Sequence, residues 1–195
     1  TQAAIQETLG LPIHYTVVVN FNSFVEVIDL LGGVEINVEK SFTDSLFPIP
    51  GKENVYPIES RYQTISFNQG PQTMDGATAL KFVRSRHAEG DEGTDFGRNK
   101  RQQLVIKALR QKLLSANIIF NQPIRSQLLN IIQKNLTTNL QPDDYPSLVN
   151  ILISSKSNPF NSISLSDESN DGEIAILENP PKYLYQNQWV LIAKD

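Results

Sequence analysis

Residues 16–38 place the strongest constraint on the fold, because their hydrophobic pattern changes twice over a short stretch of chain. The apolar, β-branched run Thr16–Phe21 is typical of a strand buried on both faces. A helix is predicted next, since Ser23 and Glu26 have capping-box spacing and the apolar residues after them follow a helical period. Val34–Val38 alternates like a half-buried strand. This order predicts an α/β fold, with the two strands parallel if they share a sheet.

The rest of the chain is predicted to contain more helices than strands. Residues 41–62 carry three prolines and are expected to be irregular. A short strand is expected over Gln63–Phe67, then a turn and short helix over Asp75–Leu80, and an extended piece that ends at Arg86. Further elements are expected as helices over 97–115, 124–136 and 146–154, a polar loop over 166–173 and a closing strand over 188–193.

Composition narrows the classes of protein to which the chain can belong. A length of 195 residues, with 39% apolar and 19% charged residues, predicts one globular domain over residues 1–195. The net charge of −4 argues against broad nucleic-acid binding, which needs a basic surface. The absence of cysteine excludes thiol catalysis and disulfides. No apolar run reaches the ~18 residues that span a bilayer.

Residues 84–103 form an island of mixed charge in this acidic chain. They hold five of its seventeen Lys and Arg residues around four carboxylates. If Leu80 to Arg86 is extended, Arg84 and Arg86 lie on one face of the strand, roughly 7 Å apart. Two guanidiniums at that separation can each bind one phosphate of a diphosphate through paired donors.

The helix that follows is expected to bring further donors to the same place. Arg98 and Gln102 share one side of this helix with Val105, which belongs to its apolar, inward stripe. Arg98 also lies in the first turn, where free N–H groups favour an anion, and Asp95 or Thr94 can cap that turn. The predicted anion site therefore consists of four side chains: Arg84, Arg86, Arg98 and Gln102.

A simpler interpretation of the same charges stays open. Arg84 and Arg86 can instead pair with the acidic residues of the loop, which gives an exposed ion-pair network of little energetic value. Lys100 and Arg101 flank the inward side of the helix and are expected to be solvated or to bind backbone. His87 is expected to be a packing or hydrogen-bonding residue at the rim, since no other histidine stands at a metal-ligand spacing.

The segment MDGATALKFVRSRHAEGDEGTDFGRNKRQQLVIKALRQKLL resembles the central signature of the LytR-CpsA-Psr (LCP) family of bacterial envelope proteins. That signature has a D-G-x-x-A-L segment, V-R-x-R, an acidic loop, D-x-G-R and R-Q-Q. The upstream segment HYTVVVNFNSFVEVIDLLGGVEINV is similar to the part of the family that precedes it. Together the similar regions cover about residues 13–114.

The resemblance implies an αβα sandwich with a mixed central β-sheet flanked by helices. It also implies a Mg2+-assisted phosphotransferase that moves a teichoic acid or capsular polysaccharide from a polyprenyl diphosphate carrier to peptidoglycan. Arg84, Arg86, Arg98 and Gln102 would then bind the diphosphate, with support from Asp95 and Arg101. The implied location is extracytoplasmic, with anchoring to the cell membrane by an N-terminal helix.

The sequence departs from the family pattern at its start. The family's aspartate-bearing strands, which hold the magnesium, and its R-D segment, which supplies a candidate base, do not precede Thr1. We therefore expect an N-terminally incomplete LCP domain with no metal ligand, no assignable catalytic residue and no transfer activity by itself. Two other functions remain open: a non-catalytic module that binds polyprenyl diphosphate-linked glycans, and a transcriptional regulator, which the acidic charge disfavours.

Overall fold

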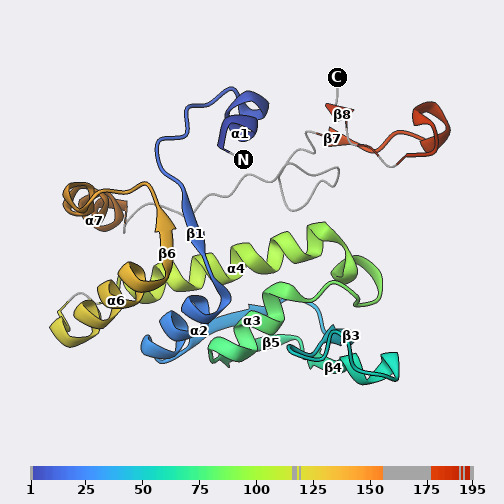
Figure 1. Ribbon diagram of the computed structural model, residues 1–195, viewed down its shortest axis with the longest axis horizontal. Helices are drawn as coiled ribbons and strands as arrows, with labels where there is room; N and C mark the ends of the chain where they lie inside the picture. The colour runs from blue at the N-terminus through green and yellow to red at the C-terminus, as the bar shows by residue number, and fades with distance from the viewer. Residues whose placement is uncertain are drawn as a thin grey trace. The chain divides into compact units, whose positions relative to one another are not determined.

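The computed structural model describes residues 2–115, 118, 120–155, 177–188, 190 and 192–193. The chain divides into two compact units, residues 1–158 and residues 159–195. Figure 1 shows the elements in chain order. In the first unit these are α1 (Gln2–Leu9), β1 (Val17–Val19), α2 (Phe21–Leu30), β2 (Val34–Val38), β3 (Phe42–Pro48), η1 (Ile58–Arg61), β4 (Tyr62–Phe67), β5 (Gly70–Met74), α3 (Gly76–Arg84), η2 (Gly90–Gly93), α4 (Asp95–Leu113), α6 (Gln122–Asn135), β6 (Leu136–Thr138), η3 (Pro142–Asp144) and α7 (Tyr145–Ser154). The second unit contains β7 (Leu177–Glu178), η5 (Lys182–Tyr185) and β8 (Ile192–Ala193).

Strands of the described residues form four two-stranded antiparallel pairs: β1 with β6, β2 with β5, β3 with β4, and β7 with β8. The α/β class is confirmed; β1 and β2 lie in different strand pairs, so the condition for a parallel arrangement of the two is not met in the described residues. Val17, Val18 and Val19 are about half exposed, so the expected burial of this strand on both faces is also wrong.

The hydrophobic core lies where α2, α3 and α4 meet β2 and the β3–β4 hairpin (Figure 1). In β2, alternate residues Val34, Ile36 and Val38 are buried, as the sequence pattern predicts. Phe82 of α3 packs against Phe42 and Phe67 of the hairpin, with ring centroids 5.9 and 5.1 Å away. Aromatic contacts of this kind attach α3 firmly to the hairpin.

Two local predictions fail, the first through a neighbouring residue and the second through pairing with another strand. The N-cap of α2 is Asn20 instead of Ser23: the Asn20 Oδ1 accepts from the Ser23 N–H at 2.7 Å and from its hydroxyl at 2.8 Å. The segment expected to be irregular over 41–62 contains β3, because Phe42 and Phe47 are both buried in the core and their strand pairs with β4 on both sides of a register shift. The neighbouring strand β4 is confirmed.

Helix α3 is longer than predicted and includes Arg84. Asp75 caps it by accepting from the Thr78 N–H at 2.8 Å, as the expected turn and helix start require. Ala79, Phe82 and Val83 then form a buried helical stripe, which continues the helix to Arg84. The expected extended conformation of Leu80 to Arg86 is therefore wrong, and Arg84 and Arg86 are not alternate residues of one strand.

The remaining helices follow the sequence pattern closely. Helix α4 begins at Asp95 and is capped by Thr94, whose Oγ1 accepts from the Gly97 N–H at 3.0 Å. Helices α6 and α7 are confirmed, and β8 occupies the end of the predicted closing strand. The predicted polar loop over 166–173 lies outside the described residues. Among the helices that the structure describes, none combines the length and apolarity required to cross a membrane.

Candidate anion-binding site

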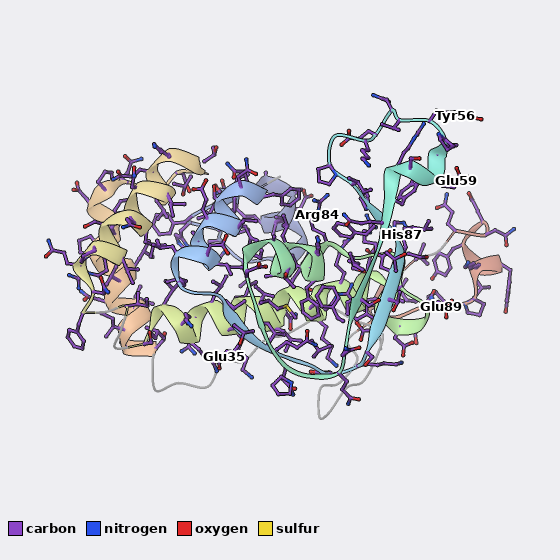
Figure 2. All side chains as sticks on the ribbon, turned by 90° about the horizontal axis from the view of Figure 1, so that it is seen from below. Glu35, Tyr56, Glu59, Arg84, His87 and Glu89 are labelled. Atoms are coloured by element: carbon purple, nitrogen blue, oxygen red, sulfur yellow. The ribbon has the colours of Figure 1, made fainter. Side chains whose placement is uncertain are left out.

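Arg84 is held at the C-terminal end of α3 by aromatic rings. Its Cζ lies 4.3 Å from the centroid of the Phe21 ring at the start of α2, and 5.8 Å from that of Phe47 in β3. Cation–π contacts of this kind stabilise a guanidinium without occupying its N–H donors. Figure 2 shows Arg84 at the end of this helix, with His87 and Glu89 in the segment that follows. Three elements, α3, α2 and β3, therefore position the Arg84 guanidinium.

Arg86 and Arg98 converge on one carboxylate oxygen. The Asp95 Oδ1 lies 3.2 Å from the Arg86 Nη2 and 3.0 Å from the Arg98 Nη2. The side chains of Arg86 and Asp95 are 57% and 67% exposed, and that of Arg98 is 28% exposed. The structure thus brings together two of the four predicted side chains, and it also shows the pairing of Arg86 with an acid that the simpler interpretation predicts. Exposed pairs of this kind contribute about 0–1 kcal/mol to stability.

Gln102 does not join Arg86 and Arg98 at the Asp95 carboxylate in the described contacts. Its residue is exposed, and its Nε2 lies 3.5 Å from the carbonyl oxygen of Val83, at the limit of a hydrogen bond. The buried side of α4 runs instead through Arg101, Val105 and Ala108. The predicted stripe through Val105 and Ala108 is confirmed, but Arg101 instead of Gln102 continues it toward the start of the helix, so the expected inward direction of Gln102 is wrong.

Arg101 is the buried cation of this region, with 2% of the residue exposed. Its Nε donates to the Phe82 carbonyl at 2.9 Å and its Nη2 to the Ser85 carbonyl at 2.7 Å. Its Nη1 donates to the carbonyl and the carboxylate of Glu92 at 2.8 and 2.6 Å. Burial lowers the pKa of Arg101 and the adjacent Glu92 carboxylate opposes this shift. The expectation that Arg101 binds backbone is confirmed, and its contacts make it part of the support of the loop.

Asp44 is a second buried charge of this region, and the sequence reasoning missed it. Its residue is 0% exposed. Its Oδ2 accepts from the Ser85 hydroxyl at 2.8 Å and from the N–H groups of Arg86 and His87 at 3.1 and 3.2 Å. Burial alone would raise the pKa of Asp44, but the hydrogen bonds outweigh burial and leave that pKa below its ordinary value.

A usable signal for Asp44 was present in the sequence. Phe42 and Asp44 are two residues apart, so they share one face of a strand, and that face carries a buried aromatic side chain. The nearby prolines concealed this alternation. The expected rim role of His87 is partly met, since the residue is exposed and its backbone N–H is bonded to Asp44.

The outer basic residues have acidic partners. Lys100 lies 2.7 Å from a carboxylate oxygen of Glu39, and Lys40 lies 3.4 Å from one of Asp91. Within the described ranges, no group of three or more His, Asp or Glu side chains is arranged to hold a metal ion. The chemistry of the described site is therefore that of arginine side chains gathered around an exposed carboxylate.

Comparison with known proteins gives a consistent match over most of the chain. The model of the LytR_cpsA_psr family matches residues 1–188. A polyisoprenyl-teichoic acid–peptidoglycan teichoic acid transferase TagU from Oceanobacillus iheyensis is 31% identical over 145 residues, which are 74% of this chain and 38% of that protein. The chain thus spans about two fifths of the length of this curated relative.

Solved structures show the same fold. The crystal structure of TagV from B. subtilis superimposes with a TM-score of 0.64 at 23% identity, over 97% of this chain and 61% of that one. A structure described as TagT bound to LI-WTA superimposes with a TM-score of 0.53 at 26% identity, over 80% of this chain and 51% of that one.

Proposed function

Because the chain belongs to the LytR-CpsA-Psr family, we propose that it binds a polyprenyl diphosphate that carries a teichoic acid-type glycopolymer. As part of the whole protein, it would take part in transferring that polymer to peptidoglycan. The names of the similar proteins support the class of substrate, since they are teichoic acid transferases that act with a polyisoprenyl carrier and peptidoglycan. The corresponding location is extracytoplasmic, with attachment to the cell membrane.

The observation that carries this proposal is the shared oxygen of Asp95. Two guanidiniums lie within 3.2 Å of the Asp95 Oδ1, so they already surround an anionic oxygen. A phosphate oxygen offers the same interaction with greater charge, and arginine can form paired donors to it. Arg84, held over Phe21, is the last residue of the helix that precedes this loop, and we propose that it supplies a third guanidinium to the ligand.

These residues suit the charge changes of the proposed reaction. A hydroxyl of the acceptor attacks the phosphorus that bears the glycan and gives up its proton. The bond from that phosphorus to the bridging oxygen breaks, and polyprenyl monophosphate leaves with the additional negative charge. Fixed guanidiniums beside the departing phosphate stabilise this charge more strongly than they stabilise the bound substrate. Gln102 lies one helical turn after Arg98 and would donate to an outer phosphate oxygen.

Magnesium, which the family resemblance implies, does not fit the described residues. Among the described residues, no three carboxylate or histidine side chains are grouped closely enough to hold a metal ion. No step of the proposed transfer is therefore assigned to a metal. The residue that removes the proton from the acceptor hydroxyl is also not assigned to this chain.

Comparing the affinities for a diphosphate and a monophosphate ligand tests this proposal. We expect the chain to bind farnesyl diphosphate, a short soluble polyprenyl diphosphate, at least about tenfold more tightly than farnesyl monophosphate. The second phosphate adds charge-assisted hydrogen bonds, each of which contributes about 1.5–3 kcal/mol. Isothermal titration calorimetry measures both affinities. Equal affinities, or no binding of either ligand, would overturn the proposed function.

A further inference from the structure

Two buried charged side chains bind the backbone of Ser85–His87, one through its N–H groups and the other through a carbonyl. The Asp44 Oδ2 accepts from the N–H groups of Arg86 and His87. Arg101 donates to the Ser85 carbonyl at 2.7 Å. Short irregular segments usually depend on water for such bonds, whereas these acceptors and donors belong to the protein. The segment therefore has a fixed course just before the loop.

An irregularity of β3 aims Asp44 at this segment. The register between β3 and β4 shifts between Asp44 and Phe47, and the Leu46 N–H turns back to the Asp44 Oδ1 at 2.9 Å. Asp44 also forms an isolated antiparallel bridge with Ala88. Such a bulge redirects side chains of its strand, and bulges are frequent beside functional sites.

The same strand contacts the two arginines in different ways. Asp44 bonds the backbone of Arg86, and Phe47, three residues later, lies beside the guanidinium of Arg84. The position of β3 therefore sets where Arg84 and Arg86 lie relative to each other. A diphosphate has a fixed distance between its phosphates, so this spacing matters for the ligand more than for the fold.

We propose that Asp44 is a positioning residue of the diphosphate site, which fixes the backbone from which Arg86 reaches the ligand. This inference rests on the proposed function, since it concerns the same ligand. Asp44 does not contact the ligand itself, because it is fully buried and its oxygens accept from four protein donors. Its effect is transmitted through the main chain of Arg86 and His87.

The test uses Asp44→Asn, which keeps the size of the side chain. An amide has one accepting oxygen, so its NH2 end must face either the Leu46 N–H or the three donors of Ser85–His87. We expect the variant to fold and to bind farnesyl diphosphate about tenfold more weakly, the loss of about one charge-assisted hydrogen bond. Val105→Ala is the matched control, since Val105 is a buried core residue of α4. It should lower the unfolding midpoint and keep affinity within twofold of wild type.

Two results would contradict the proposal: wild-type affinity in a folded Asp44→Asn chain, or an equal loss of affinity in Val105→Ala. If Asp44→Asn fails to fold, Ser85→Ala removes a single donor to Asp44, and we expect about threefold weaker binding. Unchanged affinity in that variant would also overturn the proposal.

Amide exchange separates this inference from the proposed function. We expect the Arg86 and His87 amides of the wild-type chain to be protected from hydrogen exchange, and to exchange faster in Ser85→Ala. Unprotected wild-type amides would refute the role of Asp44. Protected amides in a chain that binds no farnesyl diphosphate would refute the proposed function and leave Asp44 only its structural role.

Discussion

Polar residues of the loop region fall into two sets with different environments. The buried frame consists of Asp44, Ser85 and Arg101 together with Glu92, whose side chain is 18% exposed. The exposed rim consists of Arg86 and Asp95 together with Arg98, whose side chain is 28% exposed. In the frame, Arg101 and Asp44 each make four hydrogen bonds to protein groups. In the rim, two arginines share one oxygen of a solvated carboxylate.

The contrast shows how one short segment can have a fixed backbone and still present exposed hydrogen-bond donors. A buried charge must keep all its partners, because removing one leaves the others unpaired in a low dielectric. An exposed charge can exchange its partner at little cost, because water screens the pair. The frame therefore gives the loop its conformation, while the rim keeps its donors available to a ligand.

Removing Arg101 should have the largest effect on the stability of the fold. Arg101→Ala leaves the Glu92 carboxylate, the Phe82 carbonyl and the Ser85 carbonyl without their donor. We expect the free energy of unfolding to fall by about 3–5 kcal/mol, measured by urea denaturation. Lys107→Ala on the exposed side of the same helix is the control and should stay within about 0.5 kcal/mol of wild type. A loss below about 1 kcal/mol in Arg101→Ala would remove the distinction between frame and rim.

Removing Asp95 should have the smallest effect. Asp95→Ala breaks two exposed ion pairs, so we expect stability to change by less than about 1 kcal/mol. Affinity for farnesyl diphosphate should fall about threefold, because Arg86 and Arg98 then lose the group that holds them together before the ligand arrives. An increase in affinity would show that Asp95 competes with the ligand, and would contradict its organising role.

Local patterns in the sequence predicted the helices well. Helix α4 could be placed from its apolar stripe and its Thr94 cap, and the start of α3 from Asp75. In these cases the decisive contacts lie within one or two helical turns, so the local sequence contains them. Asp95 was likewise expected beside the arginines from its place at the start of α4.

Long-range contacts explain what the sequence did not reveal. Asp44 bonds to residues more than forty positions away, so its role depends on how β3 packs against the end of α3. Arg101 could have been recognised, since it stands four residues before Val105 on the buried face of α4. The family resemblance implies that Arg84 and Arg86 bind the diphosphate, which stays a prediction, whereas the strand geometry inferred for them was wrong.

The central claim is that the exposed rim is a diphosphate-binding site, and Arg98→Ala tests it most directly. Arg98 lies in the first turn of α4 and pairs with the exposed Asp95, a contact that contributes about 0–1 kcal/mol, so we expect the variant to keep its fold and its unfolding midpoint. Titration with farnesyl diphosphate should then show no detectable binding. The control Lys107→Ala removes an exposed basic residue further along the same helix, and this variant should bind like wild type. Near-wild-type affinity in a folded Arg98→Ala chain would contradict the account.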